Sequence, residues 1–100
     1  MSINISKERF QAALNSEFAM QVENTDAPIA LQLVKFESKI STPIQECFSM
    51  LFRAPADAPG VQMTYTLDHA DLGAQEIFLV PVKKNADGLF YEAVFNRLLV

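Results

Sequence analysis

The sequence predicts a small, mainly antiparallel β-barrel or β-roll of about six strands with one N-terminal helix, in a single domain over residues 1–100. Apolar and polar residues alternate along segments 48–52, 63–67, 77–82 and 90–95, as they do in half-buried strands. The chain is 50% hydrophobic and 20% charged, with only three glycines, which is the composition of a compact domain with one core.

The helix is predicted at the N-terminal end of the chain. Ser6 can cap it, Glu8 suits the positive end of the helix dipole, and Ile5 and Phe10 occupy the positions of a hydrophobic staple. Its apolar stripe comprises Phe10, Ala13 and Leu14. Asn15 and Ser16 supply a stop after about nine residues, which is marginal for an isolated helix, so the stripe should pack on the sheet or on another chain.

Two strands are expected next, at residues 18–22 and 29–36, joined by a turn at residues 24–26. Ile29, Leu31 and Leu33 share one face of the second strand, whereas Val34 and Phe36 continue on the other face. Since a one-residue slip moves every later side chain to the opposite face, this change predicts a bulge or bend near Leu33 and Val34 that curls the sheet.

The remaining elements follow from turn residues. Residues 39–43 form a predicted linker into a strand that ends at Arg53, and residues 54–60 contain two prolines and a glycine, which exclude regular structure. A strand at residues 61–67 is followed by a turn that Gly73 can close with a positive φ. The last two strands form a hairpin around residues 85–88, which include the turn dipeptide Asp87-Gly88.

Four blocks of this pattern, at residues 48–55, 65–73, 77–82 and 91–97, resemble a small bacterial family of about this length, the domain of unknown function DUF6916. The chain has Ala54 and Ala70 where related sequences often have Gly and Pro. Genes of this family tend to lie near genes for proteins that resemble phage-tail collar proteins, so the resemblance implies an assembly or accessory role. It implies no catalytic residue.

Charge and cysteine content exclude several classes of function. The net charge of −4 and the scattered basic residues disfavour a nucleic acid or an anionic membrane as the partner. A single cysteine, Cys47, rules out an intrachain disulfide. The N-terminus does not resemble a signal peptide and no window is apolar enough to span a membrane, so we expect a cytoplasmic location. No cofactor is expected.

The sharpest chemical candidate is the group Asp68, His69 and Asp71 at the end of a predicted strand. A metal site or a hydrolase could use His69 with either carboxylate. The chain has only one histidine, however, and no zinc-type ligand spacing. The favoured interpretation is that Asp68 or Asp71 caps the turn through a hydrogen bond from its side chain to the backbone, while His69 packs or hydrogen-bonds locally.

Three further polar residues lie within predicted strands. Cys47 adjoins Glu46 and an apolar segment, which predicts a buried, inert thiol, and Ser49 lacks the strand-to-helix turn of a catalytic serine. Glu92 lies on the face opposite Tyr91. It is either half-solvated, which we favour, or buried and paired with Arg53, Arg97 or His69.

Several strands are apolar on both faces, which predicts cover by the helix, by a partner protein or by a second copy of the chain. The preferred function is therefore a non-catalytic protein-interaction or assembly module, and not an enzyme. We expect it to self-associate or to bind a protein partner, and to be accessory to a phage-tail-like or surface-fibre system. A second hypothesis is a barrel that binds a small apolar ligand in an internal cavity. That cavity would be lined by Phe36, Phe48, Tyr65 and Phe95. An enzyme or metal site around His69 is the third.

Overall fold

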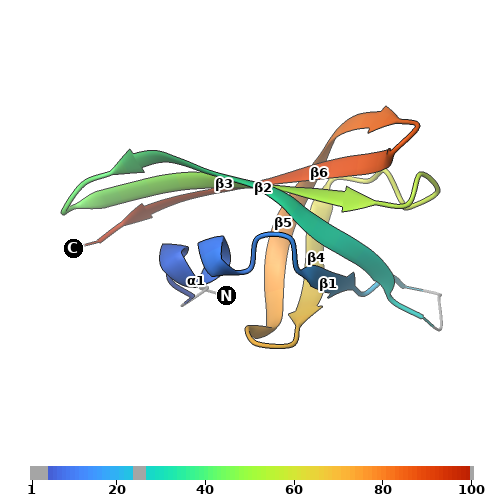
Figure 1. Cartoon of the computed structure of the whole chain (residues 1–100), viewed down its shortest axis with the longest axis horizontal. Helices are drawn as coiled ribbons and strands as arrows, with labels where there is room; N and C mark the ends of the chain where they lie inside the picture. The colour runs from blue at the N-terminus through green and yellow to red at the C-terminus, as the bar shows by residue number, and fades with distance from the viewer. Residues whose placement is uncertain (1–4, 24–26, 100) are drawn as a thin grey trace.

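The computed structural model describes residues 5–23 and 27–99 and contains the expected helix and six antiparallel strands (Figure 1). The elements are α1 (Lys7–Ala12), β1 (Glu17–Met20), β2 (Ile29–Ser41), β3 (Gln45–Ala54), β4 (Met63–His69), β5 (Gly73–Asn85) and β6 (Gly88–Leu98). The strands form one sheet in the order β1-β2-β3-β6-β5-β4, which closes in a ring because β1 also pairs with β4. The predicted fold class is confirmed.

The ring closes through its shortest strand. β1 pairs with β2 from Glu17 to Met20, but with β4 only at Ala19 and Met20, after which the Gln21 amide donates to the Thr66 carbonyl at 2.9 Å. Just before β1, the backbone of Asn15 and Ser16 exchanges two hydrogen bonds with Leu33 of β2. The N-terminal segment therefore crosses from the helix into the sheet at this position.

The predicted bulge in β2 is confirmed, since the register with β3 shifts between Leu33 and Lys35. It lies where β2 leaves β1 and bends away from the ring. A second shift, between Ser38 and Ile40, was not predicted. The predicted linker at residues 39–43 was partly wrong, because β2 continues to Ser41.

Other predicted boundaries moved by a few residues. The helix has six residues rather than about nine, and Leu14 lies beyond it and is exposed. β1 ends at Met20, two residues before the predicted end, and β4 runs from Met63 to His69 rather than over residues 61–67. The predicted turn at residues 24–26 lies outside the described residues.

The helix packs on the sheet, as expected for such a short element. Ser6 caps it by accepting a hydrogen bond from the Arg9 amide at 3.2 Å. Phe10 is completely buried, with its ring centre 6.0 Å from that of Phe48 and 5.3 Å from that of Phe95. α1 thus covers one end of the core with a single aromatic anchor.

Three strands extend past the ring and form what we call the arm, which comprises residues 36–41 of β2, 45–50 of β3 and 93–98 of β6 (Figure 1). Within the arm, Arg97 Nη2 lies 2.7 Å from Glu46 Oε2, and Arg97 Nη1 donates to the Ile5 carbonyl at 2.8 Å. The guanidinium also lies over the Phe48 ring at 5.1 Å. These contacts hold two strands of the arm and the start of α1 together.

The hydrophobic core lies inside the ring of strands. Its completely buried members with the largest side chains include Tyr91, Phe18, Phe52, Met20, Leu31, Leu33, Leu67, Ile77 and Leu79. Within the described residues, no helix is long and apolar enough to cross a membrane.

Gly88 begins β6 with a φ of 138° and lies against the backbone of β3. A Cβ at this position would collide with the Ala54 carbonyl oxygen, which cannot move without disturbing β3. We therefore expect Gly88→Ala to lower the free energy of unfolding by about 3 kcal/mol. Urea unfolding followed by circular dichroism measures this loss.

Gly60→Ala is the matched control, because a Cβ there meets no atom within 4 Å. It should change the free energy of unfolding by no more than about 0.5 kcal/mol. Equal effects of the two substitutions would contradict the close approach of β6 to Ala54.

Candidate functional site

The turn that contains Asp68, His69 and Asp71 joins β4 to β5. His69 is the last residue of β4, it pairs with Gly73, and Gly73 has a φ of 74°. The imidazole Nδ1 accepts the backbone amides of Asp71 at 3.1 Å and of Leu72 at 3.3 Å. The imidazole therefore caps the turn, and the prediction that an aspartate side chain would do so was wrong.

The second imidazole nitrogen, Nε2, faces the place where β1 and β4 close the ring of strands. His69 Nε2 lies 2.7 Å from Ser16 Oγ, and the imidazole packs 4.5 Å from the Phe18 ring centre. Since Nδ1 accepts two amides, the neutral imidazole carries its proton on Nε2 and donates it to Ser16. Ser16 Oγ in turn donates to the Ala13 carbonyl. The resulting chain of hydrogen bonds ties the turn to the end of α1.

Ser16 and His69 resemble a catalytic serine and its general base only in the distance between their side chains. A base must present a lone pair to the hydroxyl, whereas Nε2 presents a proton and the Nδ1 lone pair is occupied by two amides. Sequence reasoning assigned Ser16 only to the end of the helix. The two residues are 53 positions apart, and nothing in their local patterns links them.

The two carboxylates do not join His69. Asp68 Oδ2 accepts a hydrogen bond from Gln21 Nε2 at 2.8 Å, and Asp71 offers its backbone carbonyl to Arg9 Nη2 at 3.0 Å. No group of three metal-ligating side chains occurs within residues 5–23 and 27–99. A hollow of about 170 Å³ lies beside Ser16 and His69, which is smaller than ordinary ligand sites.

Glu92 lies half-buried on the outward face of β6, opposite Leu51 of β3 and Val80 of β5. The partners considered for it have other contacts. Arg53 donates to Gln32 at 2.5 Å, Arg97 pairs with Glu46, and His69 bonds Ser16. The half-solvated position that we favoured is the observed one.

Cys47 and Ser49 also lie on the outward face, on β3. Cys47 is half-buried rather than buried, and its neighbours across the sheet are Ile40 and Asn96. Ser49 is buried between β2 and β6, opposite Glu37 and Val94. Neither side chain has a histidine beside it in the sheet.

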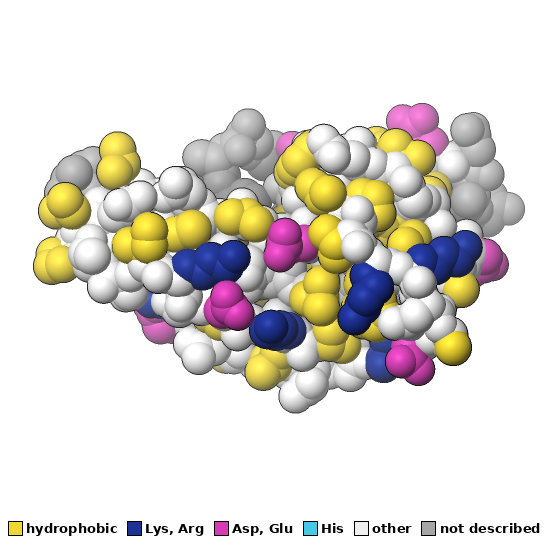
Figure 2. Space-filling view, turned by 90° about the horizontal axis from the view of Figure 1, so that it is seen from above, with side chains coloured by type: hydrophobic (Ala, Val, Ile, Leu, Met, Phe, Trp, Pro, Cys, Tyr) yellow, Lys and Arg dark blue, Asp and Glu magenta, His cyan; other side chains and the backbone are white. Residues whose placement is uncertain are grey.

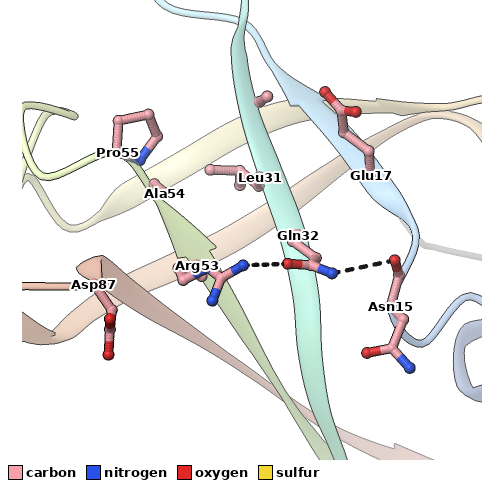
Figure 3. Close-up of a pocket in the computed structure, with 9 residues that line it drawn as sticks. Asn15, Glu17, Leu31, Gln32, Arg53, Ala54, Pro55 and Asp87 are labelled. Carbon is pink, nitrogen blue, oxygen red and sulfur yellow. Dashed lines mark hydrogen bonds between the residues drawn. The ribbon is translucent and has the colours of Figure 1, made fainter.

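A polar hollow of about 410 Å³ lies where β1, β2 and β3 meet (Figure 3). Arg53 points to Gln32, whose amide donates to the Asn15 carbonyl at 3.4 Å, and the carboxylates of Glu17 and Asp87 lie at its sides. One guanidinium flanked by two carboxylates could hold a small polar molecule, but it provides neither a nucleophile nor a metal site. Sequence reasoning did not detect this hollow.

A second hollow, which we call the apolar groove, lies between the end of β1 and the start of β4. Its volume is about 380 Å³, and its apolar lining residues are Val22, Pro59, Val61, Met63 and Tyr65. Val61 and Met63 are exposed there. The groove is large enough for a small apolar ligand.

The aromatic residues that the ligand hypothesis placed around an internal cavity are mostly packed on one another. The Phe36 and Phe48 rings stack at 5.3 Å, and Phe48 and Phe95 lie 5.1 Å apart. Tyr65 alone of the four lines the apolar groove. The ligand hypothesis therefore concerns the groove rather than the centre of the ring.

The outward side of the sheet carries what we call the outer apolar face. Its exposed members are Phe78, Val82, Val94 and Leu98, and its half-buried members are Leu51 and Val80. Val80, Glu92 and Leu51 are consecutive neighbours across β5, β6 and β3, so one carboxylate lies between two apolar members of the face. Figure 2 shows hydrophobic side chains on this side of the molecule, interspersed with charged ones.

Comparisons with known proteins give one match. The family model described as "Domain of unknown function (DUF6916)" matches residues 5–95. No curated protein and no solved structure matches the chain.

The hydrogen bonds of His69 to the turn and to Ser16 predict a structural effect of substitution. His69→Ala should lower the free energy of unfolding by about 2 kcal/mol, since it removes the acceptor of two amides and the partner of Ser16. Thermal and urea unfolding measure the loss. Asp71→Asn keeps the backbone carbonyl that Arg9 contacts and should stay within about 0.5 kcal/mol of the parent. Equal stability of the two variants would contradict a structural role for His69.

The Tyr65 and Tyr91 hydroxyls hold the proline-rich loop, because Tyr65 donates to the Val61 carbonyl at 2.6 Å and Tyr91 donates to the Pro59 carbonyl. Burial raises the pKa of both phenols above the ordinary value of 10.0. The folded state thus keeps protons that the unfolded state loses above pH 10, so stability should hold below about pH 10 and fall as the pH rises further.

Urea unfolding at a series of alkaline pH values measures this loss. Tyr91→Phe should reduce the alkaline slope and lower the neutral-pH stability by about 1 kcal/mol, because the Pro59 carbonyl loses its donor. An unchanged alkaline slope in the Tyr65→Phe/Tyr91→Phe double variant would contradict the assignment.

Proposed function

Because the chain belongs to the DUF6916 family and exposes large apolar side chains on one side of the sheet outside a filled core, we propose that it is a non-catalytic protein-interaction or assembly module. Its binding surface is the outer apolar face. Its role is accessory to a larger assembly of the phage-tail or surface-fibre type.

The observation that carries the proposal is the exposure of large apolar side chains on the outward side of the sheet. The exposed fraction is 49% for Phe78, 54% for Val94 and 75% for Leu98. The inward residues already fill the ring, so these side chains are not needed for the core. Large apolar side chains that gather on one face outside a core are typical of a site for another protein.

Charged groups within the face supply specificity. Glu92 lies between Val80 and Leu51, and Lys83 covers the Phe90 ring with its amine 4.5 Å from the ring centre. A partner must supply a group that pairs with Glu92 or leave this carboxylate in contact with water. This requirement excludes partner surfaces that are apolar but would bury Glu92 unpaired.

The turn between β4 and β5 is consistent with a binding module, because its polar side chains are used within the fold. His69, Ser16 and Asp68 each bond a neighbouring group of the fold. The phage-tail part of the proposal depends on the gene neighbourhood that the family resemblance implies, and it selects the partners to test.

A second candidate function is binding of a small apolar ligand in the apolar groove. The exposed Val61 and Met63 beside the buried Tyr65 favour it. The groove and the outer apolar face share no residue, so substitutions can separate the two functions.

Co-expression with the products of adjacent genes tests the proposal. A tagged chain should retain one of these proteins through purification, and Phe78→Lys should weaken the interaction by roughly tenfold or more, because it places a charge in the apolar contact. Titration of the purified partner by calorimetry measures the change in Kd.

Met63→Lys is the matched control, since Met63 is also exposed but lines the groove. It should leave the Kd unchanged. Loss of binding in Met63→Lys with retention in Phe78→Lys would move the interaction from the outer apolar face to the groove.

A further inference from the structure

The hollow at Arg53 brings one base and two acids together from three separate parts of the chain (Figure 3). Glu17 of β1, Gln32 of β2 and Arg53 of β3 are consecutive neighbours across the sheet, so they lie on one face of it. Asp87 lies in the turn between β5 and β6, and a Cβ at the adjoining Gly88 would lie 3.6 Å from Arg53 Cγ. The base on β3 therefore has an acid on its β2 side and another on its β6 side.

The fold leaves the charge of Arg53 uncompensated. Arg53 Nη2 donates to Gln32 Oε1 at 2.5 Å, and Gln32 is neutral. The Gln32 amide donates in turn to the Asn15 carbonyl at 3.4 Å, so both ends of this amide are engaged and its oxygen faces the guanidinium. Arg53 forms no ion pair with another described residue. Since a guanidinium has five N–H donors, Arg53 can still donate to a ligand.

The two carboxylates are equally available. Glu17 and Asp87 are exposed, and among the described residues neither forms an ion pair, although both line the hollow with Arg53. A simple anion that Arg53 attracts is repelled by two carboxylates, and a simple cation that they attract is repelled by Arg53. A molecule that carries both a carboxylate and an ammonium group complements all three charges.

We propose that this hollow binds a small zwitterion, an amino acid or a short peptide with free termini. Its carboxylate is held by Arg53, whose planar fork of donors matches a carboxylate, and its ammonium group lies near Glu17 and Asp87. The volume of about 410 Å³ is within the range of ordinary ligand sites. The hollow and the outer apolar face share no residue, so this inference goes beyond the proposed function and does not depend on it.

Titration of the full chain with glycylglycine, followed by NMR, tests the inference. The side-chain amide of Gln32 and the Nε–H group of Arg53 are the reporters, and both signals should shift. N-acetylglycine carries only the carboxylate, and glycinamide carries only the ammonium group. Glycylglycine should bind roughly tenfold more tightly than either probe, because each of them lacks one charged contact.

Glycine and triglycine extend the series and vary the spacing between the two charged groups. The tightest member identifies the ligand as an amino acid or as a peptide, and each of these should again bind more tightly than N-acetylglycine.

Substitutions assign the two charges. Arg53→Gln should weaken glycylglycine binding by roughly tenfold or more. The double variant Glu17→Gln/Asp87→Asn should bind glycylglycine and N-acetylglycine with equal affinity, because the ammonium group loses its partners. Lys35→Gln and Glu37→Gln are the matched controls, since they remove exposed charges of β2 that lie outside the hollow, and both should keep the parent's Kd.

Gln32→Glu tests whether the uncompensated charge of Arg53 is what binds. It keeps an acceptor beside the guanidinium but supplies a carboxylate from within the fold, so it should weaken glycylglycine binding by roughly tenfold while keeping the parent's unfolding midpoint. Equal affinity of the parent for glycylglycine and N-acetylglycine would overturn the inference. So would an absence of shifts at Gln32 and Arg53, or unchanged binding in Arg53→Gln.

Discussion

The structure depends on closure of the ring through β1, which has four residues and meets β4 at only two of them. So few backbone contacts would hold β1 and β4 together weakly, and the hydrogen bond between His69 and Ser16 lies at the same place. His69 ends β4 and Ser16 directly precedes β1, so their hydrogen bond fixes these two strands against each other. The residues that most resembled a catalytic group thus contribute to closing the sheet.

Closure also separates the two faces of every strand. Alternate residues on β3, β5 and β6 point into the ring, where they fill the core, and the others remain outside. The outward residues include several large apolar side chains, with Glu92 among them. The function proposed for the protein follows from this division, because the fold has no internal use for that face.

The arm is the second consequence of ring closure. β1 and β5 pair with only part of β2 and β6, so the far ends of these strands continue beyond the ring with β3 between them. Phe10 and the Arg97 to Glu46 pair stabilise the inward side of the arm. Within the arm, the register between β2 and β3 shifts between Ser38 and Ile40, whereas β3 and β6 pair in an unbroken register.

The sequence by itself determined the strand content, the N-cap at Ser6 and the bulge after Leu33, because each depends on residues within a few positions of one another. It also indicated the half-solvated position of Glu92 through simple alternation. Only the tertiary structure decided the partner of His69, the hollow at Arg53 and the second register shift. Each of these depends on contacts between residues that are distant in the chain. Local spacing carries no information about which distant residues meet when the ring of strands closes.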